Sequence, residues 1–286
     1  MIRRAAAADV PALSAFLSDH IDHSMFLLGN LERHGIGNRD HPHGTSFWLI
    51  DDGNGLCGVF GRANAGFLMV QVPGLAPPLA QALARQIAGL PVRGITGDAS
   101  QVAVMRPALG FADDDWRIDM VDPLMAHDLR ELPVFDDALR RPEPSDTALL
   151  TRWFAAYAAE TGTVDTPTAE AEAPARAAEA ISTGEVRLLL DAEGAPVAMT
   201  GINARAGSAV QVGGVYVPPA LRGRGLAGRA IAGHLCELSR LGVSRAVLFA
   251  ASDAATRAYR RIGFHTVGAY RVAMLGRPAI VEPIPD

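Results

Sequence analysis

The feature that most constrains the fold is an internal repeat, because the second half of the chain repeats the first in the same order. Three pairs of segments match: "IRRAAAADVPALSAF" (2–16) with "LRRPEPSDTALLTRW" (139–153), "VFGRANAGFLMVQV" (59–72) with "MTGINARAGSAVQV" (199–212), and "ALGFADDDWRIDM" (108–120) with "RIGFHTVGAYRVAM" (261–274). Ordered self-similarity of this kind is typical of a duplicated structural unit. The sequence therefore predicts two copies of one fold.

The boundary between the copies is expected near residues 130–137, "RELPVFDD", which gives domains 1–135 and 136–286. A length of 286 residues fits two domains. Each copy opens with apolar residues at helical spacing after a Ser or Asp, as in "DVPALSAFLSDHI" and "SDTALLTRWFAAYAAETG", and continues with strand-like runs. We predict an α/β (α+β) protein in which each copy has a mixed central sheet flanked by helices.

The second copy gives the more detailed expectation. Two strands flank a turn at 191–194, a third strand covers "AVQVGGVYV" (209–217), and a last strand covers "FHTVGAYRVAML" (264–275). Between them we expect a helix over 226–241, the strand "RAVLFA" and a short helix over 254–262. The alanine- and glutamate-rich stretch 167–182 predicts a solvated helix, with a mobile cover over a cleft as the alternative.

Composition excludes several classes of function. A net charge of −5 argues against general nucleic-acid binding. The sequence has no apolar run of about eighteen residues, and its N-terminus carries charges and a proline where a signal peptide needs apolar residues, so a cytoplasmic protein without membrane contact is predicted. Cys57 and Cys236 are expected in the core. His41 and His43 are interpreted as a polar loop, and no metal site is predicted.

The stretch "VYVPPALRGRGLAGRAIAGHL" (215–235) places glycines and arginines between a strand and a helix. A helix N-terminus presents unpaired N–H groups that favour a phosphate. Gly223, Gly225 and Gly228 are expected to keep side chains away from an anion, and Arg222 and Arg224 add positive charge. The stretch therefore predicts a pyrophosphate cradle.

Two common phosphate-binding motifs fit this stretch poorly. The three glycines satisfy G-x-G-x-x-G, but a dinucleotide site also needs an acidic residue at the end of the next strand, and none occurs before Asp253. No Gly-Lys-Ser/Thr of a Walker loop is present. A dinucleotide-binding oxidoreductase is thus a weaker alternative.

The stretch resembles the coenzyme A signature of the GNAT superfamily of N-acyltransferases, Arg/Gln-x-x-Gly-x-Gly/Ala, with Arg222, Gly225 and Ala227 in register. Downstream, "SDAATRAYRRIGF" is similar to the family's Asn-x-x-Ala-x-x-x-Tyr-x-x-x-Gly-Phe, with Ser252 in place of asparagine. The combination is most similar to tandem and FR-type acetyltransferases. The resemblance implies that acetyl-CoA, or another short acyl-CoA, is bound by Val215, Tyr216, Val217, Arg222, Gly223, Arg224, Gly225, Leu226, Ala227, Gly228, Ser252 and Ala255.

The same resemblance implies a role for Tyr259, which would be the general acid that protonates the departing thiolate, with a core aromatic as the alternative. A backbone N–H at Val215 or Val217 would polarise the thioester carbonyl. The strand "QVGG" before the cradle lacks the glutamate that many family members use as a base. Glu160, Asp165 and Asp253 are candidates, or a water relay serves.

The expected activity is transfer of an acyl group to a small-molecule or peptide amine by direct attack, and a noncatalytic acyl-CoA sensor is the main alternative. The first copy has "PGLAPPLAQALARQIAG" opposite the cradle and "DASQVAVMRPALGF" opposite the Tyr259 helix. Because it lacks the arginine-glycine run and the tyrosine, we expect it to bind no coenzyme A and to serve a structural purpose.

Overall fold

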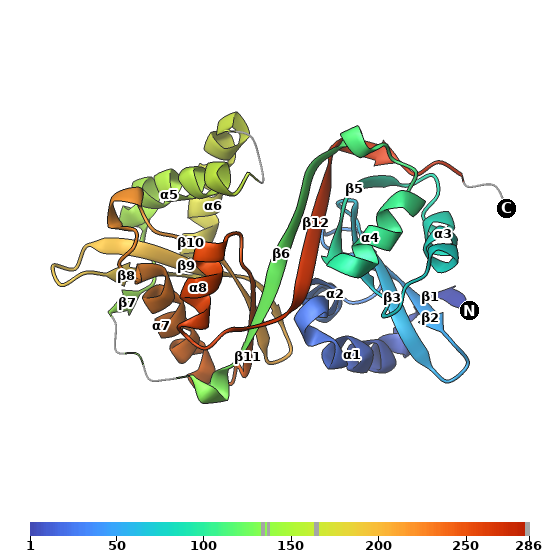
Figure 1. Ribbon diagram of the computed structural model, residues 1–286, viewed down its shortest axis with the longest axis horizontal. Helices are drawn as coiled ribbons and strands as arrows, with labels where there is room; N and C mark the ends of the chain where they lie inside the picture. The colour runs from blue at the N-terminus through green and yellow to red at the C-terminus, as the bar shows by residue number, and fades with distance from the viewer. Residues whose placement is uncertain (133–134, 136–137, 163–165, 284–286) are drawn as a thin grey trace. The chain divides into compact units, whose positions relative to one another are not determined.

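The structure is a computed structural model that describes residues 1–283 except 133–134, 136–137 and 163–165. Contacts divide the chain into two compact units (Figure 1). Unit 1 comprises Met1–Pro123 together with the C-terminal segment from Gly268, and unit 2 comprises Leu124–Val267. Each unit is a mixed sheet with helices packed on it.

Unit 1 begins with β1 (Ile2–Arg4) and the 3-10 helix η1 (Ala7–Asp9), and its remaining elements follow in chain order. They are α1 (Val10–Asp19), α2 (Ile21–His34), β2 (Thr45–Asp51), β3 (Leu56–Ala63), β4 (Phe67–Gln71), α3 (Pro77–Gln86), β5 (Pro91–Asp98), α4 (Ala99–Ala108) and η2 (Asp113–Asp115). The long strand β6 (Trp116–Asp128) then leads into unit 2.

Unit 2 repeats this order after η3 (Leu129–Glu131). Its elements are β7 (Leu139–Arg140), η4 (Pro144–Asp146), α5 (Thr147–Thr161), α6 (Thr166–Thr183), β8 (Val186–Leu190), β9 (Pro196–Ala206), β10 (Ala209–Tyr216), η5 (Pro219–Leu221), α7 (Leu226–Arg240), β11 (Arg245–Phe249) and α8 (Asp253–Arg260). The last strand of the chain, β12 (His265–Ile280), then leads back into unit 1. The helices and strands expected in the second copy are all present, with ends that differ by a few residues.

The sheets of the two units have the same topology. Unit 1 has the order β1-β2-β3-β4-β5-β12 and unit 2 the order β7-β8-β9-β10-β11-β6. In each sheet the fourth and fifth strands are parallel and the other neighbours are antiparallel. The predicted α/β fold class, with two units of mixed sheet and flanking helices, is therefore confirmed.

The units differ from the two continuous halves, 1–135 and 136–286, that the repeat led us to expect. The last strand of each half completes the sheet of the other unit, since β6 pairs with β11 through residues 124–128 and β12 pairs with β5 through Tyr270–Ile280. The boundaries consequently fall at residues 123 and 267. Sequence similarity follows the order of elements along the chain, and this exchange leaves that order unchanged.

The repeat also preserves one ion pair at the start of each copy. Arg3 donates two hydrogen bonds to Asp9 at 2.7 and 2.6 Å, and Arg140 donates two to Asp146 at 2.6 and 2.8 Å. Each aspartate also accepts from the backbone N–H three residues earlier. The Arg–Asp pair therefore fixes the chain between the first strand and the first helix of each copy.

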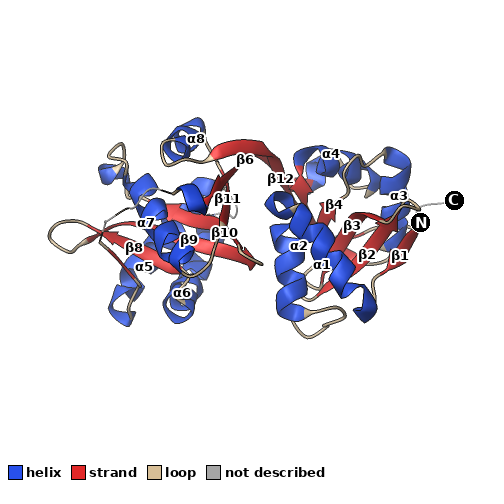
Figure 2. Cartoon of the chain, turned by 90° about the horizontal axis from the view of Figure 1, so that it is seen from below, coloured by secondary structure: helices blue, strands red, loops and turns tan. Residues whose placement is uncertain are grey.

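Helices cover both faces of each sheet (Figure 2). In unit 2, Leu188 and Met199 pack against α5 and α6, whereas Leu189 and Ala198 pack against α7. Adjacent residues of a strand point to opposite faces, so this alternation places the two helix layers. In unit 1, α3 and α4 cover the large core cluster that includes Phe60 and Ile95.

Helix α6 departs from the solvated helix expected over 167–182. Ala169, Ala173, Ala177 and Ala180 form a buried stripe, and α6 packs against α5 and β8. Small side chains at spacings of three and four allow this close approach. The two cysteines form no disulfide and are half-buried, and so are less buried than the core positions expected. In the described part of the chain, no helix has the length and apolar character that crossing a membrane requires.

Candidate functional site

The site begins where two neighbouring strands of unit 2 separate. Strands β10 and β11 are paired only as far as Val212 and Leu248. Beyond this point the β10–β9 register shifts between Gly213 and Tyr216, which is a β-bulge. Bulges beside active sites redirect a strand and leave backbone groups without a ladder partner. The backbone of residues 213–217 is thus exposed to the space between the separating strands.

Helix α7 begins directly above this opening, after the loop from Pro218 to Gly225. Gly225 is the N-cap residue, and no side chain caps the helix. The first N–H groups of a helix have no acceptor within the helix. The start of α7 therefore offers free backbone donors and positive helix-dipole potential to an anion.

The three glycines of this stretch, two in the loop and one in the first turn of α7, have different surroundings. Gly223 and Gly225 have φ of 78° and 74°, in the left-handed region that favours glycine. Gly228 has ordinary helical geometry, and an added Cβ would lie 3.3 Å from Ile262 Cγ2. Gly228 therefore also lets α7 pack closely on Ile262, which follows α8, and its expected role of keeping a side chain away from an anion stays a prediction.

Arg222 is held by three groups in the structure. Its Nε donates to Val217 O at 2.9 Å, and its Nη2 donates to both carboxylate oxygens of Glu160 at 2.8 and 2.7 Å. The guanidinium also lies over the Tyr216 ring, 5.8 Å from its centroid. Arg224 is exposed, and its Nη2 lies 3.5 Å from Ala220 O.

A cavity of about 600 Å³ joins the strand opening, the start of α7 and helix α8. Of the residues predicted to bind acyl-CoA, together with Tyr259, Arg224 is the one that does not line it. Those that do are Val215, Tyr216, Val217, Arg222, Gly223, Gly225, Leu226, Ala227, Gly228, Ser252, Ala255 and Tyr259. Residues separated by more than forty positions in sequence thus meet around one space.

Helix α8 carries Tyr259 to the inner wall of the cavity. The helix is capped by Ser252, whose hydroxyl accepts from Ala255 N at 3.1 Å. Burial, with a further contribution from neighbouring Tyr157, raises the pKa of Tyr259 to about 12. The phenol consequently keeps its proton at any physiological pH and can donate it.

Sequence reasoning missed several residues that line the same cavity. Tyr157 and Thr161 come from α5, and Arg257 and Arg261 come from α8 and its end. Among the described lining residues, Arg222, Arg257 and Arg261 are cationic and Glu160 is the acidic one. The spacing of Arg257 and Arg261, one helical turn apart, could have indicated a shared face. The local charge is therefore positive although the chain is negative overall.

The three candidate bases are placed differently. Glu160 lines the cavity but is engaged by Arg222. Asp253 is exposed in the first turn of α8 and does not line the cavity, whereas its neighbours Ser252 and Ala254 do. Asp165 lies outside the described residues. Tyr259 lines the cavity and keeps its proton, and its role as the general acid stays a prediction.

The corresponding part of unit 1 lacks the free backbone N–H groups that unit 2 offers at the start of α7 and at the end of β10. Its helix α3 starts with Pro77 and Pro78, so the first two helical positions have no N–H. The N–H of Val72, at the end of β4, donates to the buried Gln101 side chain at 2.6 Å. Donors that are free in unit 2 are thus absent or already paired in unit 1.

Comparison with known proteins agrees with this geometry. Residues 156–274 match the family model described as "Acetyltransferase (GNAT) domain", from α5 to within β12. No curated protein matches the sequence.

Three solved structures share the fold along nearly the whole chain. A Drosophila protein is 13% identical over 96% of this chain and 98% of its own, with a TM-score of 0.62. A GCN5-related N-acetyltransferase from Sphaerobacter thermophilus is 17% identical over 100% and 97%, with a TM-score of 0.55. A GNAT-family acetyltransferase from Colwellia psychrerythraea is 13% identical over 97% and 100%, with a TM-score of 0.52. Residues 156–274 are therefore similar to the acetyltransferase domain of the GNAT family, and the solved structures share the fold of the whole chain.

Proposed function

We propose that this protein is an acyl-CoA-dependent N-acyltransferase, in the simplest case an acetyltransferase, with one acyl-CoA site per chain in unit 2. The observation that carries the proposal is the joint lining of one cavity by the separated end of β10, the uncapped start of α7 and the protonated Tyr259. Transfer from an acyl-CoA thioester requires N–H donors that bind the pyrophosphate, a strand edge that pairs with the amides of the pantetheine arm, and a proton donor for the departing sulfur.

The backbone N–H groups at the start of α7 bind the pyrophosphate of coenzyme A, and the arginines that line the cavity supply counter-charge. The exposed β10 backbone at Val215 and Val217 pairs with the amides of the pantetheine arm. One N–H of this segment polarises the thioester carbonyl and stabilises the oxyanion that forms when the amine attacks. Tyr259 then donates its proton to the sulfur as the C–S bond breaks, and the proton that the attacking amine loses passes through water and restores the phenol.

The acceptor is a small-molecule or peptide amine, whose attack on the thioester releases coenzyme A as a free thiol. Release of free thiol during incubation with acetyl-CoA and a panel of small amines and peptide N-termini tests the proposal. We expect amine-dependent thiol release above the rate with water alone. Tight acetyl-CoA binding without thiol release from any amine would instead support a sensor of acyl-CoA.

The Arg222–Glu160 pair predicts a specific effect on cosubstrate affinity. Both side chains are 46% exposed. The Glu160 carboxylate accepts hydrogen bonds from the Arg222 guanidinium, the group that would otherwise bind a phosphate. Glu160→Gln removes a negative charge from the cavity, so acetyl-CoA affinity should rise up to about fivefold, the range of an exposed ion pair. Isothermal titration calorimetry of both proteins measures this change.

Glu193→Gln is the matched control, because Glu193 is an exposed acid in the turn between β8 and β9. It should leave affinity unchanged. If Glu160→Gln left affinity unaltered and lowered turnover at saturating acetyl-CoA more than about tenfold, Glu160 would be the general base and the electrostatic account would be wrong.

A further inference from the structure

Three histidines come together in unit 1, and none of them is among the residues that line the cavity of unit 2. His34 is the last residue of α2, and His41 and His43 lie in the loop between α2 and β2. One ring nitrogen from each lies within 4.8 Å of the others. The His34 and His41 rings are stacked with centroids 4.0 Å apart, and the His43 ring is edge-on to both, at 6.3 and 5.4 Å. The sequence pattern HPH contains His41 and His43. It gave no indication of His34, which lies before the loop at the end of α2.

The loop that carries His41 and His43 is fixed by hydrogen bonds along its length. The Asn64 side chain donates to Asn38 O at 2.9 Å and to His41 O at 2.8 Å. Gly44 N also donates to His41 O at 2.9 Å, and Thr45 Oγ1 donates to His43 O at 2.8 Å. The backbone on both sides of the two histidines is therefore tied to β3 and β2. This network positions the backbone that carries the two imidazoles before any ligand binds, while the side chains keep their rotational freedom.

A close approach also explains the glycine that ends the loop. A Cβ added at Gly44 would lie 2.2 Å from Asn38 O and 2.7 Å from Asn64 Nδ2. Only glycine fits between these groups. The close packing of Gly44 therefore fixes the loop backbone, and this backbone holds His41 and His43 beside His34 at the end of α2.

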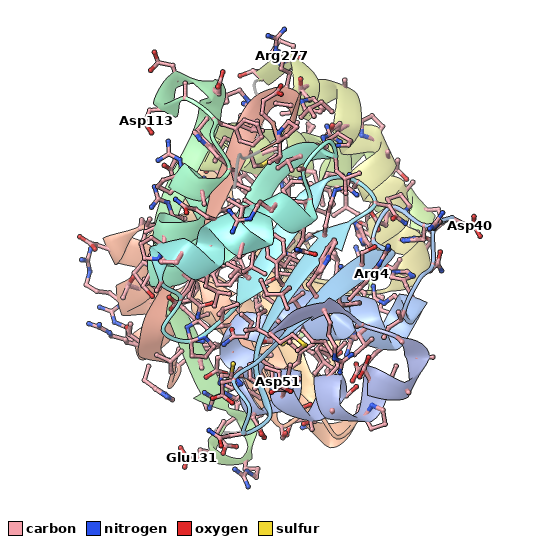
Figure 3. All side chains as sticks on the ribbon, turned by 90° about the vertical axis from the view of Figure 1, so that its right-hand side faces the viewer. Arg4, Asp40, Asp51, Asp113, Glu131 and Arg277 are labelled. Atoms are coloured by element: carbon pink, nitrogen blue, oxygen red, sulfur yellow. The ribbon has the colours of Figure 1, made fainter. Side chains whose placement is uncertain are left out.

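The chemistry of the cluster selects its ligand. Its three nitrogen donors suit zinc and neighbouring transition ions, whereas Mg²⁺ and Ca²⁺ prefer oxygen. His34 is half-buried, and His41 and His43 are exposed, so water can complete a coordination shell on the solvent side. Asp40, which precedes His41, lies at the surface of this unit (Figure 3).

We propose that His34, His41 and His43 form a binding site for a divalent transition ion, represented by Zn²⁺, with water in the remaining position. Nitrogens bound to one tetrahedral zinc lie about 3.4 Å apart, so modest side-chain rotations bring the three donors into range. His41 Nδ1 accepts a hydrogen bond from His43 N at 3.1 Å. The bonds of Asn64 and Gly44 are to the backbone of the loop, so coordination by the rings leaves them intact. The ion clamps the loop to the end of α2.

The test is titration of the metal-free full chain with Zn²⁺ alone, followed by calorimetry and by the change in melting temperature. We expect one zinc per chain and a rise in melting temperature, because the ion binds the folded state. His34→Gln and His41→Gln should each weaken zinc binding more than about tenfold, since even indirect support of a metal ligand is worth about that much. Mg²⁺ at the same concentration should give no shift.

His265→Gln is the matched control, because His265 is exposed in β12 and lies outside the cluster. It should bind zinc as the unaltered protein does. Acetyl-CoA binding and circular dichroism of each variant report whether it has folded, and they are independent of the metal site. Absence of a saturable zinc isotherm in the unaltered chain, or the same isotherm in a His34→Gln, His41→Gln double variant that is folded, would overturn the proposal.

Discussion

Tyr259→Phe is expected to lower the turnover number about a hundredfold while changing acetyl-CoA affinity little. The substitution deletes the hydroxyl and keeps the ring, which packs near Phe264 with centroids 6.3 Å apart. Because the pKa of Tyr259 is about 12, the unaltered enzyme should lose its proton donor only as the pH rises towards that value. The pH–rate profile should therefore show no fall in the turnover number from deprotonation of this residue below about pH 11.

Steady-state kinetics with saturating amine and calorimetry with acetyl-CoA measure the two quantities separately. Tyr270→Phe is the matched control, since Tyr270 is a buried tyrosine of unit 1 whose pKa is also raised by burial. It should leave turnover unchanged. Equal turnover of Tyr259→Phe and the unaltered protein would show that Tyr259 is a core aromatic residue.

Gly225→Val should abolish most acetyl-CoA binding, with an affinity loss of more than about tenfold. Valine is strained at φ 74°, so the loop must change shape and the free N–H groups at the start of α7 lose their common direction. No atom would contact an added Cβ at this position, so steric collision is not the cause. The expected effect is therefore on donor geometry.

A second glycine separates strain from function. Gly194, in the turn between β8 and β9, has φ 81° and equally open space around an added Cβ. Gly194→Val and Gly225→Val should lose similar stability in thermal unfolding, by roughly 1–2 kcal/mol. Only Gly225→Val should lose affinity. Retention of acetyl-CoA binding in both variants would remove the start of α7 from the proposed site.

The sequence predicted the order of elements well because repeated residues make repeated local structure. Arg3 with Asp9 and Arg140 with Asp146 occupy matching positions and form the same pair. The exchange of β6 and β12 could not be predicted in this way. A strand with two free edges pairs wherever its hydrophobic face and register fit, and the repeat describes only its place along the chain.

The candidate site was predicted from residues that the chain concentrates in two short segments. Arg222 and Tyr259 both line one cavity, as the motif spacing indicated. Residues that approach from other elements were missed, because α5 contributes Tyr157 and Thr161 without any local signal. His34 was missed for the same reason, since six residues of loop separate it from His41.

Titration of the full chain with acetyl-CoA, with NAD as a parallel ligand, tests the central claim most directly. Unit 2 offers free N–H groups at the start of α7, whereas Pro77 and Pro78 remove them at the start of α3. Calorimetry should therefore give one acetyl-CoA per chain and no saturable binding of NAD. Two equivalent acetyl-CoA sites, or binding of NAD in place of acetyl-CoA, would contradict a single acyl-CoA site in unit 2.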